Sequence, residues 1–286
     1  MSLRDIALEV GRIVQDAGKH AFQTQTNPHD LNLSSIPDTR VRLESIIDKK
    51  LVDFIENRLT YLEPYQGMWR DRPEEGQPGD RYWCVGNIDG VINFARNMPE
   101  WTITVSLFEF VTATHAHPIL GVVHAPALGM TYLAAEGEGA IRIRRTPVGD
   151  KQERIMPSAL SSLEGSVVGF GMSHVPEESA RAFALLGLIA EKPADIKRIG
   201  PVSLDLCKVA DGTYDAYFEP HLHQWDIPAV SAGTVVVRQA QGKVTQWFDD
   251  TIHWRGENDI VASNGLIINE LEPYFQRLPF VPSNHS

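Results

Sequence analysis

A carboxylate next to a glycine turn is the first feature of this sequence that could do chemistry. Residues 83–94 read Trp-Cys-Val-Gly-Asn-Ile-Asp-Gly-Val-Ile-Asn-Phe, so an apolar strand runs into Asp89 and Gly90 and then into a helix. This order would hold the Asp89 carboxylate beside backbone N–H groups that face an anion. Asp-Gly pairs also form ordinary turns, so the segment alone supports a purely structural interpretation as well.

Two later segments add a second carboxylate and a second glycine turn. The run from Glu219 to Asp226 precedes an apolar helix, where Asp226 could be a metal ligand or the residue that caps the helix. Gly200 stands at a strand-to-helix turn, where it could cradle a ligand or simply join two elements. Taken singly, neither segment decides between its two interpretations.

The histidines offer a different chemistry. His115 and His117 share one face of a predicted strand and His124 follows one strand later, so a zinc site is conceivable. No acidic or sulfur ligand accompanies them at a recognisable spacing, and exposure or ordinary hydrogen bonding satisfies most histidines. We therefore expect surface or core histidines here, and the same for His221 and His223.

Together and in this order, the segments resemble the signatures of the inositol monophosphatase family of magnesium-dependent phosphatases. The family's Asp-Pro-Ile-Asp-Gly-Thr-x-Asn-Phe is similar to residues 86–94, and its Trp-Asp-x-Ala-Ala/Gly is similar to residues 225–229. Residues 121–141 resemble its Gly-Val-Val-x-x-Pro and Gly-x-Gly-Ala strands, and residues 200–212 resemble its Gly-Ser-Ala-Ala-x-x-x-Cys-x-Val-Ala-x-Gly helix. The resemblance covers nearly the whole chain and implies the family's α+β fold, a layered αβαβα sandwich.

The resemblance also implies a site in which carboxylates hold Mg²⁺, or Mn²⁺ in its place, and the ions bind the phosphate. We expect one or two ions at most. The implied metal ligands are Asp89, the carbonyl of Ile88, Asp226, Glu63 and Asp38. The implied catalytic residues are Asp89 and Glu63, and the implied substrate- or phosphate-binding positions are Gly90, Val91, Gly200 and Glu219.

Three positions of the first signature depart from the family. Gly86 replaces the acid that bridges two metals, Asn87 replaces the proline, and Val91 replaces the threonine that positions the attacking water. Losing one such electrostatic group typically costs on the order of 10²–10³ in rate. Two hypotheses follow. The chain is a slow or altered phosphomonoesterase for a small polyol or sugar phosphate, or it is a catalytically silent homologue that binds a phosphorylated ligand or a protein partner.

The elements that must position these residues follow from hydrophobic periodicity. A helix is predicted from Leu3 to a stop at Gly18, and a second helix from Pro37–Asp38 onward. Short strands separated by Pro and Gly run from Trp101 to Arg145 as an antiparallel meander. A polar connection over 146–164 then leads into alternating strands and helices. We expect an N-terminal α+β half over 1–148 and a C-terminal α/β half over 149–286, which together form one compact unit.

The composition of the chain excludes several classes of protein and of partner. The 286 residues include 26 Lys plus Arg and 37 Asp plus Glu, a net charge of −11, which argues against a nucleic-acid partner and has the wrong sign for direct phosphate binding. The apolar content of 43% and the two cysteines exclude disorder and a disulfide scaffold. Without a signal-like N-terminus or an apolar run of membrane length, we expect a cytoplasmic protein with no membrane partner. The resemblance favours a homodimer.

Overall fold

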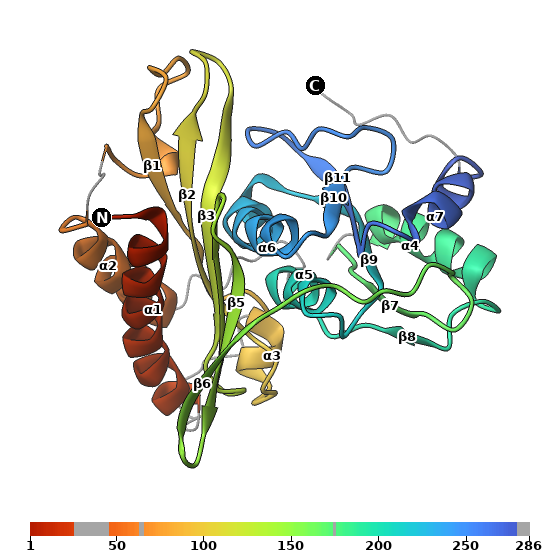
Figure 1. Ribbon diagram of the computed structural model, residues 1–286, viewed down its shortest axis with the longest axis horizontal. Helices are drawn as coiled ribbons and strands as arrows, with labels where there is room; N and C mark the ends of the chain where they lie inside the picture. The colour runs from red at the N-terminus through yellow and green to blue at the C-terminus, as the bar shows by residue number, and fades with distance from the viewer. Residues whose placement is uncertain (26–45, 63–65, 174–175, 279–286) are drawn as a thin grey trace.

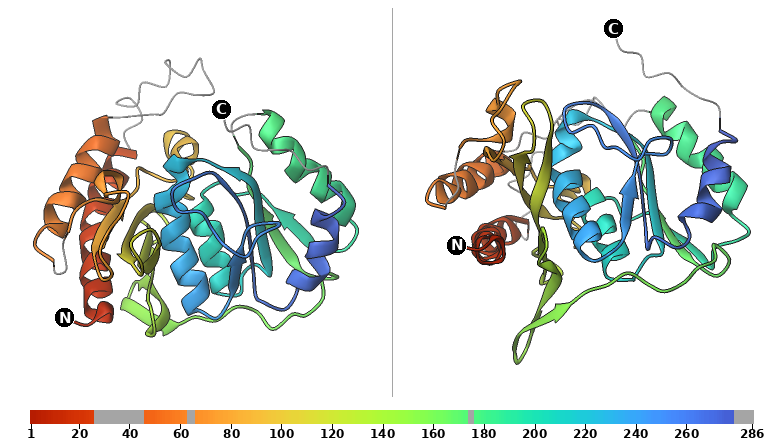
Figure 2. Two further views of the ribbon diagram at one scale, coloured as in Figure 1. Left: turned by 90° about the horizontal axis from the view of Figure 1, so that it is seen from above. Right: turned by 45° about the horizontal axis from the view of Figure 1, so that its top comes forward.

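The structure is a computed structural model that describes residues 1–25, 46–62, 66–173 and 176–278. Within these residues two β-sheets alternate with three helical layers (Figure 1). The order across the molecule is helix, sheet, helix, sheet, helix, and both further views in Figure 2 show the same layers. The predicted αβαβα sandwich is confirmed.

The first helical layer holds α1 (Leu3–Gln25) and α2 (Ile46–Leu59). The Ser2 side chain accepts the Asp5 N–H at 3.1 Å and Asp5 accepts the Ser2 N–H at 3.2 Å, a reciprocal capping box that starts α1. The predicted stop at Gly18 is wrong. A Cβ at that position would lie 2.7 Å from the His124 ring, so Gly18 lets α1 pack closely against the sheet. The predicted start of the second helix lies outside the described residues.

The first sheet is an antiparallel meander in the order β1-β2-β3-β4-β5-β6, as the sequence predicts between 101 and 145. Its last strand, β6, was not predicted and lies in the expected polar connection, so this sheet extends past residue 148. The strands are β1 (Arg81–Val85), β2 (Ile103–Phe110), β3 (Ala116–Ala125), β4 (Met130–Ala135), β5 (Gly139–Thr146) and β6 (Gly149–Arg154). Helix α1 packs on one face.

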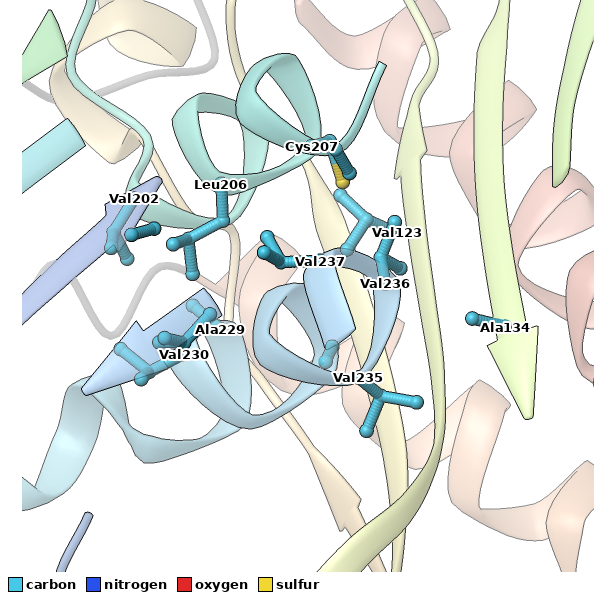
Figure 3. Close-up of a cluster of buried hydrophobic side chains, with 14 of the residues drawn as sticks. Val123, Ala134, Val202, Leu206, Cys207, Ala229, Val230, Val235, Val236 and Val237 are labelled. Atoms are coloured by element: carbon cyan, nitrogen blue, oxygen red, sulfur yellow. The ribbon is translucent and has the colours of Figure 1, made fainter. Parts of the chain in front are cut away.

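The central layer consists of α5 (Val202–Ala210) and α6 (Ile227–Gln239), which pack on each other and on both sheets. Figure 3 shows part of this core, in which valines of α6 meet Leu206 and Cys207 of α5 and Val123 of β3. The neighbouring Val122 points the other way, into the core under α1. Alternating strand residues thus bury both faces of the first sheet.

The second sheet has the order β10-β11-β9-β7-β8 and is mixed, with β7 parallel to both β8 and β9. Its strands are β7 (Val167–Phe170), β8 (Asp195–Lys197), β9 (Ala216–Leu222), β10 (Lys243–Thr245) and β11 (Asn258–Ser263), of which β11 was not predicted. Helices α4 (Pro176–Ile189) and α7 (Ile268–Phe275) form the last layer. In the described ranges, no helix is both long and apolar enough to cross a membrane.

Candidate active site

Asp89 lies just after β1, where a short helix, α3 (Val91–Ala95), begins. Its backbone pairs with Thr102 in both directions, at 3.0 and 2.9 Å, which fixes the turn against the start of β2. Gly90 has φ +81°, a conformation that side chains rarely adopt, so the glycine is required there. The Asp89 carboxylate Oδ2 accepts the Ser203 N–H at 2.9 Å and the Ser203 hydroxyl at 2.6 Å. The Asp89–Gly90 turn therefore positions the Asp89 carboxylate against the N-terminal end of α5.

Asp226 lies at the N-terminus of α6, at the end of a 3-10 turn, η4 (Gln224–Asp226). Its Oδ2 accepts the N–H of His223 at 2.8 Å, so the side chain bonds backward and makes no cap bond to α6 itself. Both interpretations of Asp226 from the sequence are therefore incomplete: it occupies the capping position of α6, yet its carboxylate braces the turn before the helix.

Two more carboxyls lie near this pair. Glu219 on β9 is buried and accepts the Tyr217 hydroxyl at 2.6 Å. Asp205 on α5 is 1% exposed, and neither of its carboxylate oxygens has a hydrogen-bond partner in the structure. Asp205 was not predicted as a site residue, although it lies within residues 200–212, which resemble a helix of the family. An acid amid the apolar residues of a short helix was the available signal.

We call Asp89, Asp205, Glu219 and Asp226 the acid cluster. Asp89 and Asp226 keep part of their surface exposed, yet burial raises the pKa of each, and of Asp226 to about 6. Burial likewise raises the pKa of Asp205 to about 7 and that of Glu219 well above its usual range. Asp89 adds to the shift of the other three as a like charge. Burial, reinforced by the like charge of Asp89, therefore makes ionisation of these carboxyls less favourable than in water.

Gly86 directly follows Val85, the last residue of β1. Its N–H bonds to the Thr104 carbonyl at 3.1 Å, and a Cβ on it would lie 2.6 Å from Thr104 Oγ1 and 3.1 Å from Pro228 Cβ. Thr104 and Pro228 therefore already fill the space that a side chain at position 86 would need. The position of the missing acid is therefore already filled by neighbouring atoms. Replacing the glycine alone would not restore a carboxylate there.

The structure also shows where most of the other predicted site residues lie. Val91 is the first residue of α3 and follows directly on the turn, and the Ile88 side chain is buried on the N-terminal side of it. Gly200, with φ +128°, precedes α5, where a Cβ would come within 3.2 Å of Asn93 Nδ2. Asn93 in turn donates to the Ile199 carbonyl at 2.9 Å, which ties the two turns together. Glu63 and Asp38 lie outside the described residues.

His221 and His223 lie beside a carboxylate that comes from another element. His221, His223 and Glu178 each offer a ligand atom, and these atoms lie within 4.8 Å of one another, the one such group of three found in the described part of the chain. His223 Nε2 is 3.1 Å from a Glu178 oxygen, whereas the buried Nε2 of His221 has no hydrogen-bond partner. The donor types fit zinc better than magnesium. Glu178 arrives from α4, far away in sequence, so spacing gave no signal.

The earlier histidines do behave as expected. His124 is buried, bonds through Nδ1 to Thr131 Oγ1 at 2.9 Å, and burial lowers its pKa to about 4. It is a core histidine. His117 lies 3.5 Å from a Glu136 oxygen at the surface. Neither joins a metal-ligand group among the described residues.

The sequence matches the model of the inositol monophosphatase family over residues 4–277. The chain belongs to this family. A histidinol-phosphatase of Mycobacterium tuberculosis is 30% identical over 216 residues, 72% of this chain and 77% of that protein. A fructose-1,6-bisphosphatase/inositol-1-monophosphatase of Thermotoga maritima is 32% identical over 200 residues, 69% and 70% of the two chains.

Further comparisons extend the family relationship. A Nus factor SuhB of Haemophilus influenzae is 30% identical over 207 residues, 70% of each chain. Among solved structures, the extragenic suppressor protein SuhB of Bartonella henselae superposes with a TM-score of 0.75 at 25% identity, covering 93% of this chain and 96% of that one. The relatives of this family member therefore include proteins named as phosphatases and proteins named as Nus factors.

The family is generally metal-dependent, and the acid cluster fits that property only in part. Asp89 Oδ2 and Asp226 Oδ2 accept hydrogen bonds from Ser203 and His223, and both side chains remain partly exposed, so both carboxylates could contact a cation. The charge excess of the cluster also fits a cation. A second ion bridged through position 86 does not fit, because Gly86 has no carboxylate and its surroundings are filled. The described residues fit one ion better than two.

Proposed function

We propose that this chain is a metal-dependent phosphomonoesterase that hydrolyses the phosphate ester of a small polyol or sugar, and that it is slow. One Mg²⁺ or Mn²⁺ would be held by Asp89, Asp226 and the Ile88 carbonyl, with Glu63 and Asp38 as further proposed ligands. Such an ion supplies positive charge for the phosphate and makes a water molecule more acidic. The observation that carries the proposal is the acid cluster, four neighbouring carboxyls whose pKa values are raised, first of all by burial.

The remaining residues would bind and orient the substrate. The turn at Gly90 and Val91 brings backbone N–H groups to the Asp89 carboxylate, where a phosphate could also accept them. Glu219 would accept hydrogen bonds from substrate hydroxyls, with its orientation fixed by Tyr217. Gly200 keeps the α5 turn open beside Asn93. Val91 cannot donate a hydroxyl to orient the attacking water, which is why we expect slow turnover.

The test combines a metal titration with phosphate release. The full chain is treated with EDTA, and its melting temperature is followed as Mg²⁺ or Mn²⁺ is added. Phosphate release is then measured on inositol 1-phosphate, a nucleoside bisphosphate and an aryl phosphate. We expect metal-dependent stabilisation and slow turnover, and we expect Asp226→Asn to reduce both, with a loss of about 10²-fold in rate.

His221→Ala is the matched control for that experiment. It removes a nitrogen from the neighbouring Glu178 and His223 group but leaves Asp89 and Asp226 in place. Its response to Mg²⁺ should equal that of the wild type. Metal-independent melting together with no turnover on any of the substrates would refute the proposed function.

A second candidate function is favoured by the packing at Gly86. Since Thr104 and Pro228 occupy the place of the bridging acid, the site is consistent with a family member that binds a phosphorylated ligand or a protein without hydrolysis. A relative that carries the name Nus factor rather than an enzyme's name is consistent with this role. Val91→Thr separates the two candidates because it adds a hydroxyl at almost constant volume. A gain in turnover supports the slow enzyme, and unchanged silence supports the binding protein.

We also propose a homodimer, a cytoplasmic location and a division into halves near residues 148 and 149. Family resemblance supports the dimer, and two buried, unpaired cysteines, Cys84 and Cys207, are consistent with a reducing compartment. Light scattering during gel filtration tests the dimer, and fractionation of cells that express the tagged full chain tests the location. Limited proteolysis tests the boundary.

A further inference from the structure

A cavity of about 240 Å³ lies next to the acid cluster, and no acidic side chain is among its described lining residues. Cys84 and Val85 of the lining come just before Gly86, and Gln224, Ile227 and Pro228 flank Asp226. The other lining residues are Met68, Trp69, Arg70, Arg72, Trp83, Trp254 and Arg255. In a protein with a net charge of −11, this cavity gathers three arginines.

The arginines differ in what holds them. Arg70 forms a two-pronged ion pair with Glu56, with Nη2 to Oε2 at 2.7 Å. Arg72 donates to the Trp69 carbonyl at 2.8 Å and lies 4.2 Å from the Trp69 ring centre. Arg255 donates to the Pro73 carbonyl at 3.3 Å and lies 5.7 Å from the Phe110 ring centre. No carboxylate of the described residues pairs with either. Burial first, and then the charge of Arg255, lower the pKa of Arg72.

Three N–H groups of the lining residues are also without acceptors. Trp69 Nε1, Trp83 Nε1 and Arg72 Nε are all buried from solvent and make no hydrogen bond in the structure. Trp69 is 4% exposed and Trp83 is fully buried, and the Trp69 ring is fixed by stacking on Phe108 at 3.9 Å between ring centres. A buried donor left unpaired destabilises a fold by roughly 1–3 kcal/mol. The two guanidinium groups without a carboxylate partner are therefore the charged groups that the cavity offers to a ligand.

We propose that this cavity binds the phosphate group of a small phosphorylated ligand. A phosphate monoester carries about −1.5 to −2 charges near pH 7, which matches the two unpaired guanidinium groups of Arg72 and Arg255, whereas a carboxylate would balance only one. Its oxygens could accept N–H donors of both guanidinium groups together. The inference does not depend on hydrolysis at the acid cluster, because the arginines bind the anion without a metal ion.

The test is calorimetric titration of the full chain with inorganic phosphate in EDTA at constant ionic strength. We expect saturable binding, accompanied by a change in tryptophan fluorescence because Trp69 and Trp83 line the cavity. Arg255→Gln should weaken phosphate affinity about tenfold or more. The charge-matched control is Arg277→Gln, which removes a cation stacked on Tyr274 of α7 and should leave the affinity unchanged.

Three results would overturn the proposal: no phosphate binding in EDTA, equal affinity in wild type and Arg255→Gln, or tighter binding of succinate than of phosphate. Asp226→Asn keeps this test separate from the proposed hydrolysis. That variant should lose turnover while it still binds phosphate in EDTA. Circular dichroism and the melting temperature of each variant establish that it is folded before its affinity is compared.

Discussion

The acid cluster and the cavity that holds Arg72 and Arg255 are neighbours with opposite, unbalanced charge. The first consists of four carboxyls whose pKa values are raised, and the second contains two guanidinium groups that no described carboxylate pairs. Among the described residues, no ion pair joins a carboxylate of the acid cluster to Arg72 or Arg255, and Pro228, which lines the cavity, lies beside Gly86. Each region therefore keeps its charge for something from solution: a cation on one side, an anion on the other.

The difference in local charge between the two regions explains how a protein with a negative net charge could bind a phosphate. A chain with 11 excess negative charges has the wrong overall sign for a phosphate ligand, and metal ions are one way to reverse that sign locally. The cavity with Arg72 and Arg255 reverses it with the protein's own side chains. Local composition around a site, rather than the total, decides which ion it binds.

The largest effect is expected from Gly86→Asp, which would break the contact that separates the two regions. The new Cβ meets Thr104 Oγ1 and Pro228 Cβ, and the carboxylate adds charge beside Asp89. We expect a loss of about 3 kcal/mol or more in the free energy of unfolding, measured by urea denaturation. Adding Thr104→Ala should recover part of that loss. A Gly86→Asp protein as stable as the wild type would show that the space is open.

Asp205→Asn tests the effect of a buried carboxyl in the acid cluster on stability. Burial holds the pKa of Asp205 at about 7, above its ordinary 3.8, so the folded state keeps a proton that the unfolded chain releases. Stability contributed by this group is therefore present below about pH 4 and is lost as the pH rises to about 7. In EDTA at pH 8, we expect Asp205→Asn to be more stable by about 2 kcal/mol, with the difference vanishing near pH 4.

Melting curves of both proteins across pH 4–8 measure the Asp205 effect. A difference that does not change with pH would show that the amide acts through packing alone. A loss of stability at every pH would mean that the Asp205 carboxylate has a partner that the structure does not reveal.

Ser203→Ala tests how firmly the protein itself holds Asp89. The Ser203 hydroxyl donates to Asp89 Oδ2 and lies 2.6 Å from Thr102 Oγ1. We expect a loss of about 1–2 kcal/mol in the free energy of unfolding. The matched control is Ser231→Ala, which breaks a hydroxyl pair with Ser106 at 2.7 Å but touches no carboxylate. If both variants lose the same amount, the bond to Asp89 adds nothing beyond an ordinary buried hydroxyl.

The smallest effect is expected on the basic side. Arg255→Gln removes a charge that repels Arg72, so without phosphate it should stabilise the protein by about 0.5 kcal/mol. Added phosphate should raise the melting temperature of the wild type and leave that of Arg255→Gln almost unchanged. Scanning calorimetry in EDTA measures both. Equal phosphate effects in the two proteins would place the anion elsewhere.

Much of the fold could be predicted, because its elements carry clear hydrophobic periodicity. The strands from β2 to β5 and the helices α5 and α6 bury one face or both. This burial is visible in the sequence as regularly spaced apolar residues. Strand β6 reads Gly-Asp-Lys-Gln-Glu-Arg and is exposed on nearly every residue, so it carries no apolar alternation. It forms because β5 offers an edge, and its charges are typical of an edge strand. Gly18 was misjudged for a related reason: only the neighbouring His124 shows why glycine is needed there.

The site residues also divide into those that could be predicted from the sequence and those that could not. Asp89, Glu219 and Asp226 were found because they fall within short, ordered signatures. The lining of the basic cavity was not found, because Trp69, Trp83 and Arg255 come from three separate parts of the chain and share no spacing. Asp205 looked like one polar residue in a helix until its burial was known. What folding brings together from distant segments leaves no pattern in the sequence.

The central position of α6 has a consequence for biosynthesis. When the ribosome has made residues up to Arg154, every strand of the first sheet exists, and α1 can cover one face. The opposite face waits for α6, which ends only at Gln239. At about 5–20 residues per second, that apolar face stays open for on the order of ten seconds. The nascent chain therefore offers chaperones a binding surface that the finished protein hides, and a fragment truncated after β6 should aggregate.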